Sequence, residues 1–430
     1  MRITGQKWVL AVLIIVHLLS CNQQNNSEKT MQDQQSNITA KDILGNPDYQ
    51  AISFGGYRTN TRDTQPTVGE LKEDMKIMHA MGIRLLRTYN VKLAHASNLL
   101  KAIAELKQEQ PGFEMYVMLG AWIDCLNAWT DKPVDHNKES PENEKEIARA
   151  VALANQYPDI VKIIAVGNEA MVKWAATYYV EPWVILKWVN HLQGLKAKGE
   201  LSSDLWITSS DNFASWGGGG TEYHVEDLNK LIAAVDFLSV HTYPMHDTHY
   251  NPAFWGTLET EQDLSKTEKI FSSMKRSLDY AKLQYNTVVK YMKDQGINKP
   301  VHIGETGWAS FSNGHYGDDG SQATDEYKEG VYYSMMRDWT NESGISCFYF
   351  EAFDETWKDA ANPGGSENHF GIFTIDGKAK YAIWDLVDKK IFEGLGRSGK
   401  PVEKTYDGDL QKLLESVKSP EMKDTLEITY

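Results

Sequence analysis

The segment Lys162–Gly167 (KIIAVG) is a short apolar run that leads directly into Asn168 and Glu169. The sequence has eight such runs, and several of them are almost continuously apolar, which is typical of parallel strands buried on both faces. The other seven runs, all rich in β-branched and aromatic residues, are Ala51–Gly55, Ile83–Tyr89, Met115–Trp122, Leu205–Ser209, Asp236–His241, Val301–Gly304 and Ser346–Glu351. The pattern therefore predicts eight strands of one buried sheet.

Helical patterns separate these strands. Thr67 and Glu70 have the spacing of a capping box, the apolar residues that follow fall on one helical face, and Gly82 marks the end of that helix. A second helix is expected to begin at Ser140-Pro141. Further helical patterns cover Trp183–Leu195, Ile270–Met292, Tyr327–Trp339 and Ile383–Phe392.

Strands that alternate with helices predict an α/β protein built as a single (β/α)8 TIM barrel domain. The alternative is a doubly wound open sheet, which would need a Gly-rich phosphate loop after the first strand. The sequence has no such loop at that place. The run Gly217–Gly220 follows the fifth strand instead and predicts a mobile loop.

The first 20 residues have the features of an export signal, with Arg2 and Lys7 before an apolar run at Trp8–Leu19. The run is too short for a membrane span and ends in LLSC, which resembles the bacterial lipobox, so Cys21 is the expected lipidation site. A plain secretory signal is the alternative. We expect a lipid-anchored protein of the bacterial cell envelope, at the outer membrane or cell surface, or else a secreted or periplasmic one.

The chain is divided accordingly into residues 1–20 as signal, 21–45 as a polar tether, 46–394 as the barrel and 395–430 as a C-terminal extension. The tether is polar and poor in apolar residues, as flexible linkers are. The extension is charged and has an amphipathic stretch at Leu410–Val417, which leaves open whether it packs on the barrel.

Composition excludes several classes of function. The 44 basic and 59 acidic residues give a formal charge of −15, which argues against a nucleic-acid partner. Beyond Cys21, the cysteines Cys125 and Cys347 do not form a disulfide framework, and no His/Cys cluster has metal-ligand spacing. We expect no metal, no cofactor and no membrane contact besides the lipid anchor, in a protein that is a monomer.

Active sites of TIM barrels lie at the carboxyl ends of the strands. By this criterion Glu169, after the fourth strand, and Glu305, at the end of the seventh, point into one cleft. Glycoside hydrolysis needs such a pair, one carboxyl to protonate the leaving oxygen and one carboxylate to attack. Aromatic residues that could stack on sugar rings also follow the strands: Trp122, Trp129, Trp174, Trp216, Tyr243, Trp255, Trp308 and Trp357.

Four segments together resemble glycoside hydrolase family 17: Val166–Glu169, Gly304–Ser310, Phe353–Lys358 and Asn368–Phe373. That family contains β-1,3-glucanases on TIM barrels. The resemblance covers roughly residues 51–392, and Ala309 replaces the proline that is usual at its position.

The resemblance implies roles for individual residues. Glu169 matches the general acid/base and Glu305 the nucleophile, while Asn168 matches the residue that hydrogen-bonds the sugar 2-hydroxyl. Tyr89 and Tyr243 match aromatic residues of the reactive subsite. A further set is expected to act beside them, Trp308 as a sugar-stacking wall and Glu355 with Lys358 as a charged pair that tunes the carboxylate pKa values.

The expected activity is endo-hydrolysis of a β-1,3-glucan of the laminarin type with retention of configuration, and the expected partner is that polysaccharide. A β-1,3-glucan transglycosylase would use the same covalent intermediate and is the nearest alternative. A non-catalytic, glycan-binding surface lipoprotein is the alternative from another class. Glu351 and His241, also at strand ends, are each assigned either to the site or to structural contacts.

Overall fold

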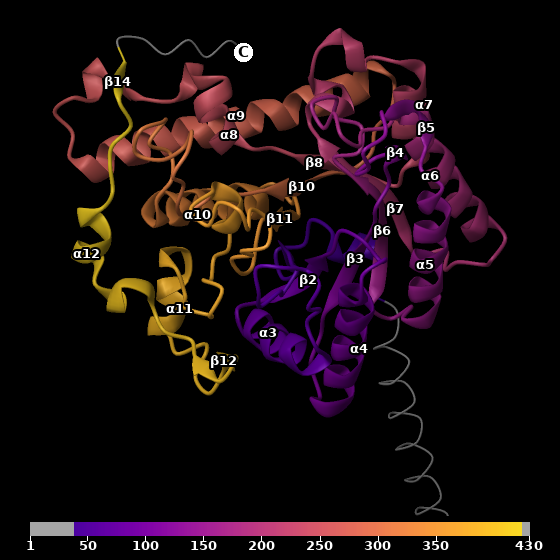
Figure 1. Cartoon of the computed structure of the whole chain (residues 1–430), viewed down its shortest axis with the longest axis horizontal. Coiled ribbons are helices and arrows are strands. Elements are labelled where there is room, and N and C mark those ends of the chain that lie inside the picture. The colour runs from indigo at the N-terminus through magenta and orange to yellow at the C-terminus, as the bar shows by residue number, and fades with distance from the viewer. Residues whose placement is uncertain (1–37, 424–430) are drawn as a thin grey trace, which may run out of the picture. The chain divides into compact units, whose positions relative to one another are not determined.

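The computed structural model describes residues 38–423. Within this part of the chain, eight parallel strands close into a barrel in the order β1-β11-β10-β8-β7-β6-β3-β2 (Figure 1). The predicted (β/α)8 barrel is therefore confirmed. The strands are β1 (Gln50–Ser53), β2 (Ile83–Arg87), β3 (Tyr116–Ala121), β6 (Val161–Asn168), β7 (Trp206–Asn212), β8 (Leu238–His241), β10 (Val301–Thr306) and β11 (Cys347–Tyr349).

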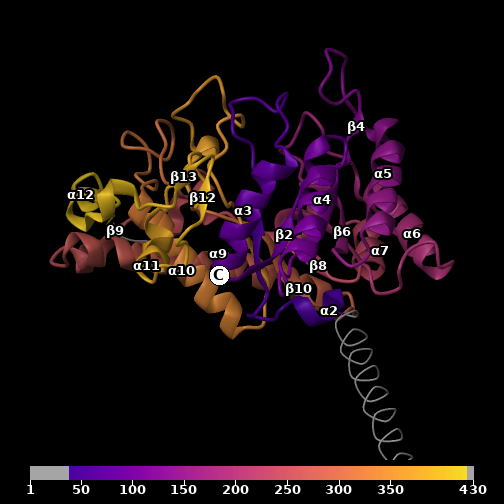
Figure 2. The ribbon, with the colours of Figure 1, turned by 90° about the horizontal axis from the view of Figure 1, so that it is seen from below.

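Helices connect the strands and cover the outside of the barrel; α3 and α4 lie side by side there (Figure 2). Thr67 caps α3 through the predicted capping box with Glu70. The connecting helices are α3 (Val68–Ala80), α4 (Ala94–Glu109), α5 (Glu142–Gln156), α6 (Pro182–Ala197), α7 (Glu226–Ala234), α9 (Lys266–Asp294), α10 (Glu326–Glu342) and α11 (Trp384–Asp388).

The helix predicted at Ile383–Phe392 is shorter than expected. It ends at Asp388, because Lys390 has a left-handed backbone with φ of +58° that a helix cannot accommodate. The remaining elements are α2 (Ala40–Ile43), β4 (Cys125–Leu126), β5 (Asp135–Glu139), α8 (Pro244–Tyr250), β9 (Thr257–Leu258), β12 (Gly396–Arg397), β13 (Lys400–Pro401), α12 (Leu410–Glu415) and β14 (Met422–Lys423).

Two predictions from the sequence need correction, one about a domain boundary and one about a loop. The compact unit begins at Ala40, inside the stretch predicted as tether, because the side chains of Ala40 and Ile43 are fully buried. The predicted mobile loop at Gly217–Gly220 is also wrong in part. Gly217 is buried in a π-helical turn, and a Cβ there would lie 2.2 Å from the ring of Tyr291.

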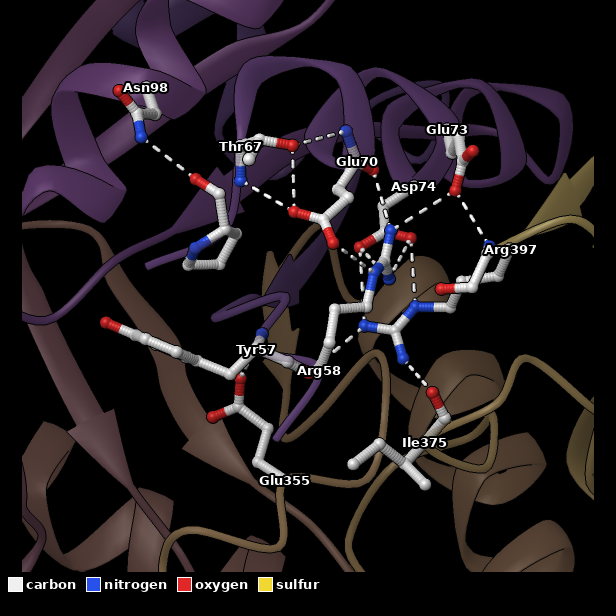
Figure 3. Close-up of polar contacts among 12 residues, drawn as sticks. Tyr57, Arg58, Thr67, Glu70, Glu73, Asp74, Asn98, Glu355, Ile375 and Arg397 are labelled. Atoms are coloured by element: carbon white, nitrogen blue, oxygen red, sulfur yellow. Dashed lines mark hydrogen bonds and ion pairs between the residues drawn. The ribbon is translucent and has the colours of Figure 1, made fainter. Parts of the chain in front are cut away.

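The C-terminal extension packs on the barrel. Leu413 and Val417 are buried, and β14 pairs with β9. The hairpin β12-β13 places Arg397 beside Asp74 of α3, with Arg397 Nε 3.0 Å from Asp74 Oδ1 (Figure 3). Arg58 donates to the same oxygen at 2.9 Å, and the Arg397 and Asp74 side chains are fully buried.

The signal segment and Cys21 lie outside the described residues. None of the helices between residues 38 and 423 has both the length and the apolar character that crossing a membrane requires. Cys125 and Cys347 are buried, free thiols in this part of the chain.

Candidate active site

Glu169 and Glu305 lie at the same end of the barrel. Glu305 belongs to β10, and Glu169 directly follows β6, which is separated from β10 by β7 and β8 on one side of the barrel. Glu169 has a φ of +44°, and its backbone N–H donates to the carbonyl of Ser210 at 3.0 Å. Such a left-handed backbone is unfavourable for a residue with a side chain and is found mainly where function requires it.

Three donors hold the carboxyl group of Glu305. Arg87 Nη1 and the hydroxyl of Tyr89, at 3.0 Å, donate to Oε2, while the hydroxyl of Tyr243 donates to Oε1 at 2.7 Å. Burial alone raises the pKa of Glu305, but the charges of His241 and Arg87 and the hydrogen bond from Tyr243 outweigh it and lower the pKa to about 2. Glu305 is therefore ionised at neutral pH.

The carboxyl group of Glu169 is more accessible, with a quarter of its side chain exposed. Its Oε1 lies 3.1 Å from Nδ1 of His241, a side chain that is fully buried. The other ring nitrogen of His241 lies 2.8 Å from Ser210 Oγ and 3.3 Å from Arg87 Nη2. His241 thus connects Glu169 with the guanidinium group that contacts Glu305.

A second carboxyl group lies behind Glu169. Asp211 accepts hydrogen bonds from the backbone N–H of Met171 at 2.8 Å and from Ser215 Oγ at 2.6 Å. Burial, and to a smaller extent the charge of Glu169, raises the pKa of Asp211 to about 6 despite these hydrogen bonds. Through its hydrogen bond with the N–H of Met171, Asp211 fixes the backbone just after Glu169.

Asn168 is oriented by Arg87. Its Oδ1 accepts a hydrogen bond from Arg87 Nη2. Because a guanidinium group can only donate, this contact assigns the oxygen of the amide to Arg87 and leaves the Nδ2 hydrogens as donors for a ligand. Asn168 is partly exposed, so those donors can reach a sugar hydroxyl.

Glu355 and Lys358 form the expected pair, with Lys358 Nζ 3.7 Å from Glu355 Oε2. Lys358 Nζ is even closer to Glu351, at 3.3 Å, so Glu351 belongs to this charged group. Arg87 makes the direct ion pair with Glu305, and the charge of Glu305 is also among the smaller causes that raise the pKa of Lys358, after Glu351 and Glu355. A Cβ at Gly55 would lie 2.0 Å from Glu355 Oε1, so a larger residue at this position would displace the Glu355 carboxyl group.

Trp308 is not a sugar-stacking wall. Its ring is fully buried between Trp255 and Tyr332, and its Nε1 donates to the carbonyl of Ala323 at 2.8 Å. Trp216 and Trp255 are buried as well. Among the tryptophans that the sequence placed at the strand ends, two are mostly exposed. These are Trp129, at 63%, and Trp174, at 61%.

Sequence reasoning did not assign roles to Arg87 and Asp211, and it left His241 open between a role in the site and a structural role. The signal for Arg87 was available, because it directly follows Leu85 and Leu86 at the end of a buried strand run, where a charged side chain needs a buried anion as its partner. The described residues contain no group of three or more His, Cys, Asp or Glu side chains that could hold a metal ion.

Residues 51–371 match the model of the BtgE/BtgC glycoside hydrolase domain. The chain belongs to the BtgE/BtgC glycoside hydrolase family, which is of the family 17 type. Among solved structures, this glycoside hydrolase is similar to an endo-laminarinase from Formosa Hel1_33_131, with 68% identity and a TM-score of 0.90. The likeness covers 91% of this chain and all of that one.

Two more distant relatives of this glycoside hydrolase come from fungi. It is 28% identical to a glucan 1,3-beta-glucosidase of Arthroderma benhamiae over 75% of this chain and 86% of the relative. It is 22% identical to a putative glucan endo-1,3-beta-glucosidase btgC of Aspergillus niger, covering 70% of this chain. The glycoside hydrolase spans only 37% of the length of that btgC protein.

Proposed function

We propose that this glycoside hydrolase is an endo-acting β-1,3-glucanase that cleaves laminarin-type glucan with retention of configuration. The observation that carries the proposal is the difference between the two carboxyl groups of the site. Glu305 is buried, ionised and held by three donors, whereas Glu169 is a partly exposed carboxyl group at the same end of the barrel. The likeness to an endo-laminarinase over nearly the whole chain supports the choice of substrate.

Glu305 acts as the nucleophile. Its carboxylate attacks the anomeric carbon, the glycosidic bond breaks, and a covalent glycosyl-enzyme forms. Tyr243, Tyr89 and Arg87 keep the carboxylate ionised and oriented for this attack. Asn168 donates from Nδ2 to the 2-hydroxyl of the bound sugar, where hydrogen bonds strengthen in the transition state.

Glu169 acts as the general acid and then the general base. It protonates the oxygen of the leaving glucan segment, and in the second step it removes a proton from the water that hydrolyses the glycosyl-enzyme. His241, whose Nδ1 lies 3.1 Å from Oε1, holds Glu169 in position. Configuration is retained because two successive displacements occur at the anomeric carbon.

The test is incubation with laminarin and a panel of defined β-glucans, with chromatography of the products. Endo action releases a series of oligosaccharides early, whereas exo action releases one small product. NMR of the first product reports its anomeric configuration, and an inverted product would refute the mechanism. Products longer than the substrate at high oligosaccharide concentration would identify a transglycosylase, and no release from any glucan would identify a glycan-binding protein.

We also propose that the chain is exported and lipid-anchored through Cys21 at the bacterial cell envelope. The support is the sequence alone, namely the basic start, the apolar run Trp8–Leu19 and the LLSC ending. Mass spectrometry of the N-terminal peptide from native membranes tests this, because a diacylglyceryl group adds a defined mass to Cys21. In a Cys21→Ala variant the protein should leave the membrane fraction.

The proposed oligomeric state is a monomer. No partner surface is required by the site, since Glu169, Glu305 and the groups that hold them all come from one chain. Light scattering after size-exclusion chromatography should give the mass of a single chain, and a dimer mass would contradict the proposal.

A further inference from the structure

Three aromatic side chains contact one another in the segments that follow β3 and β6. The rings of Trp129 and Tyr178 are stacked, with centroids 5.1 Å apart and an interplanar angle of 21°. The ring of Trp122 lies 5.4 Å from Tyr178 and 6.3 Å from Trp129. Trp129 is 63% exposed, so this group, which we name the aromatic platform, offers an indole face to solvent.

Contacts within the two segments support the platform. Burial raises the pKa of Asp124, and the neighbouring Trp122 and Trp129 side chains oppose this shift, so both indoles lie next to that carboxyl group. The backbone N–H of Cys125 donates to the carbonyl of Tyr178 at 3.1 Å and joins the two segments. Trp129 has a φ of +61°, a backbone state that is unfavourable for a large side chain and is retained mainly at functional sites.

The platform lies at the catalytic end of the barrel. Trp122 directly follows β3, Glu169 directly follows β6, and these two strands pair with each other. Tyr178 belongs to the segment between Glu169 and α6. Burial, followed by the charges of Glu169 and Asp211, raises the pKa of Tyr178, which agrees with a position close to Glu169.

We infer that the aromatic platform is the subsite for the reducing-end segment of the glucan, the part that leaves when the bond is cut. The inference rests on the proposed function. Glu169 must reach the glycosidic oxygen that departs with this segment, so the sugar rings just beyond that oxygen lie on the Glu169 side of the site. The C–H face of a glucose ring is apolar and flat and can stack on the indole of Trp129.

The test compares a substrate that occupies the platform with one that cannot. Laminarihexaose has glucose units on both sides of the cleaved bond, whereas β-laminaribiosyl fluoride has only fluoride as its leaving group. In Trp129→Ala we expect kcat/KM for laminarihexaose to fall about tenfold, the equivalent of losing one aromatic contact. For the fluoride it should fall far less, and the active fluoride reaction also shows that the variant is folded.

Two further variants sharpen the comparison. Trp129→Phe keeps a ring and should recover most of the kcat/KM for laminarihexaose. Phe271→Ala removes another exposed ring, 53% accessible on α9, and should leave the ratio of the two substrates as in the wild type.

Equal losses on both substrates in Trp129→Ala would overturn the inference, because the platform would then act only by supporting the catalytic carboxyl groups. No loss on either substrate would overturn it too. Failure of the proposed function looks different, since a wild-type enzyme that cleaves neither substrate refutes the glucanase itself and the subsite with it.

Discussion

The hydroxyl of Tyr243 lies 2.7 Å from Oε1 of Glu305 and donates to it, at the point where β8 and β10 end side by side. Tyr89 and Arg87 donate to the other oxygen, Oε2. Both oxygens of the carboxylate therefore have donors before a substrate arrives, and hydrogen bonds to the charged form of an acid lower its pKa. This arrangement has a measurable consequence for pH dependence.

Tyr243→Phe should raise the pKa of Glu305, because the hydrogen bond from the phenol is lost. The wild-type pKa of about 2 lies below the ordinary value of 4.5, so Glu305 stays ionised in mildly acidic solution. The acid limb of kcat/KM should move to higher pH in the variant, with more activity lost near about pH 4 than near about pH 7. The pH profiles of both enzymes check this.

The free energy of unfolding should depend on pH through the same carboxyl group. Because the pKa of Glu305 is lower in the folded protein, its ionised carboxylate stabilises the fold above pH 4.5. This contribution disappears as the pH falls through about 2. Tyr243→Phe should therefore destabilise the protein most near neutral pH. Tyr285→Phe, which removes a hydroxyl that donates to the carbonyl of Val301, is the control and should leave the acid limb unchanged. A common shift in both variants would contradict the assignment.

Azide should distinguish the roles of the two glutamates. Glu305→Ala should lose about 10⁴-fold or more in kcat, as removal of a nucleophile does elsewhere. Azide can enter the space left by the carboxylate, attack from the same side and give an α-glycosyl azide. Glu169→Ala on an aryl glycoside should instead yield the β-glycosyl azide, because azide then replaces the water of the second step. NMR of the products decides, and exchanged configurations would reverse the assignment.

Trp308→Phe should affect stability and not substrate binding. The ring is fully buried, and its Nε1 donates to Ala323, so the substitution leaves a carbonyl without its donor and a small cavity. We expect a loss of about 1–3 kcal/mol in the free energy of unfolding. Denaturant unfolding measures it, and KM for laminari-oligosaccharides should be that of the wild type. A rise in KM at unchanged stability would restore a stacking role.

Arg397→Ala should destabilise the protein strongly. The substitution removes one of two guanidinium groups from the buried carboxylate of Asp74, and breaking a buried ion pair costs about 3–5 kcal/mol. Lys400→Ala in the same hairpin is the matched control, because its ion pair with Asp376 is mostly exposed. Thermal unfolding should show a large fall in Tm for the first variant and little change for the second.

The sequence predicted the barrel because its strands are buried runs and its first connecting helix has a capping box, both of which are local patterns. The placement of Glu169 and Glu305 at one end of the barrel was predictable for the same reason, since the end of a strand is local information. Features that depend on tertiary contacts were not. Burial of Trp308 depends on Trp255 and Tyr332, from two other segments, and burial of Ala40 and Ile43 makes part of the predicted tether a helix.

The ion pair that joins Asp74 to Arg397 connects residues 323 positions apart. During synthesis at about 5–20 residues per second, Arg397 follows Asp74 by roughly 16–65 s. The closing pair of the barrel, Ile52 with Tyr349, is nearly as distant. Until β11 is made, β1 and β10 each lack one of their two neighbouring strands, so the barrel cannot close. Chaperones that act during synthesis would therefore meet a chain with unpaired strand edges and not the finished enzyme.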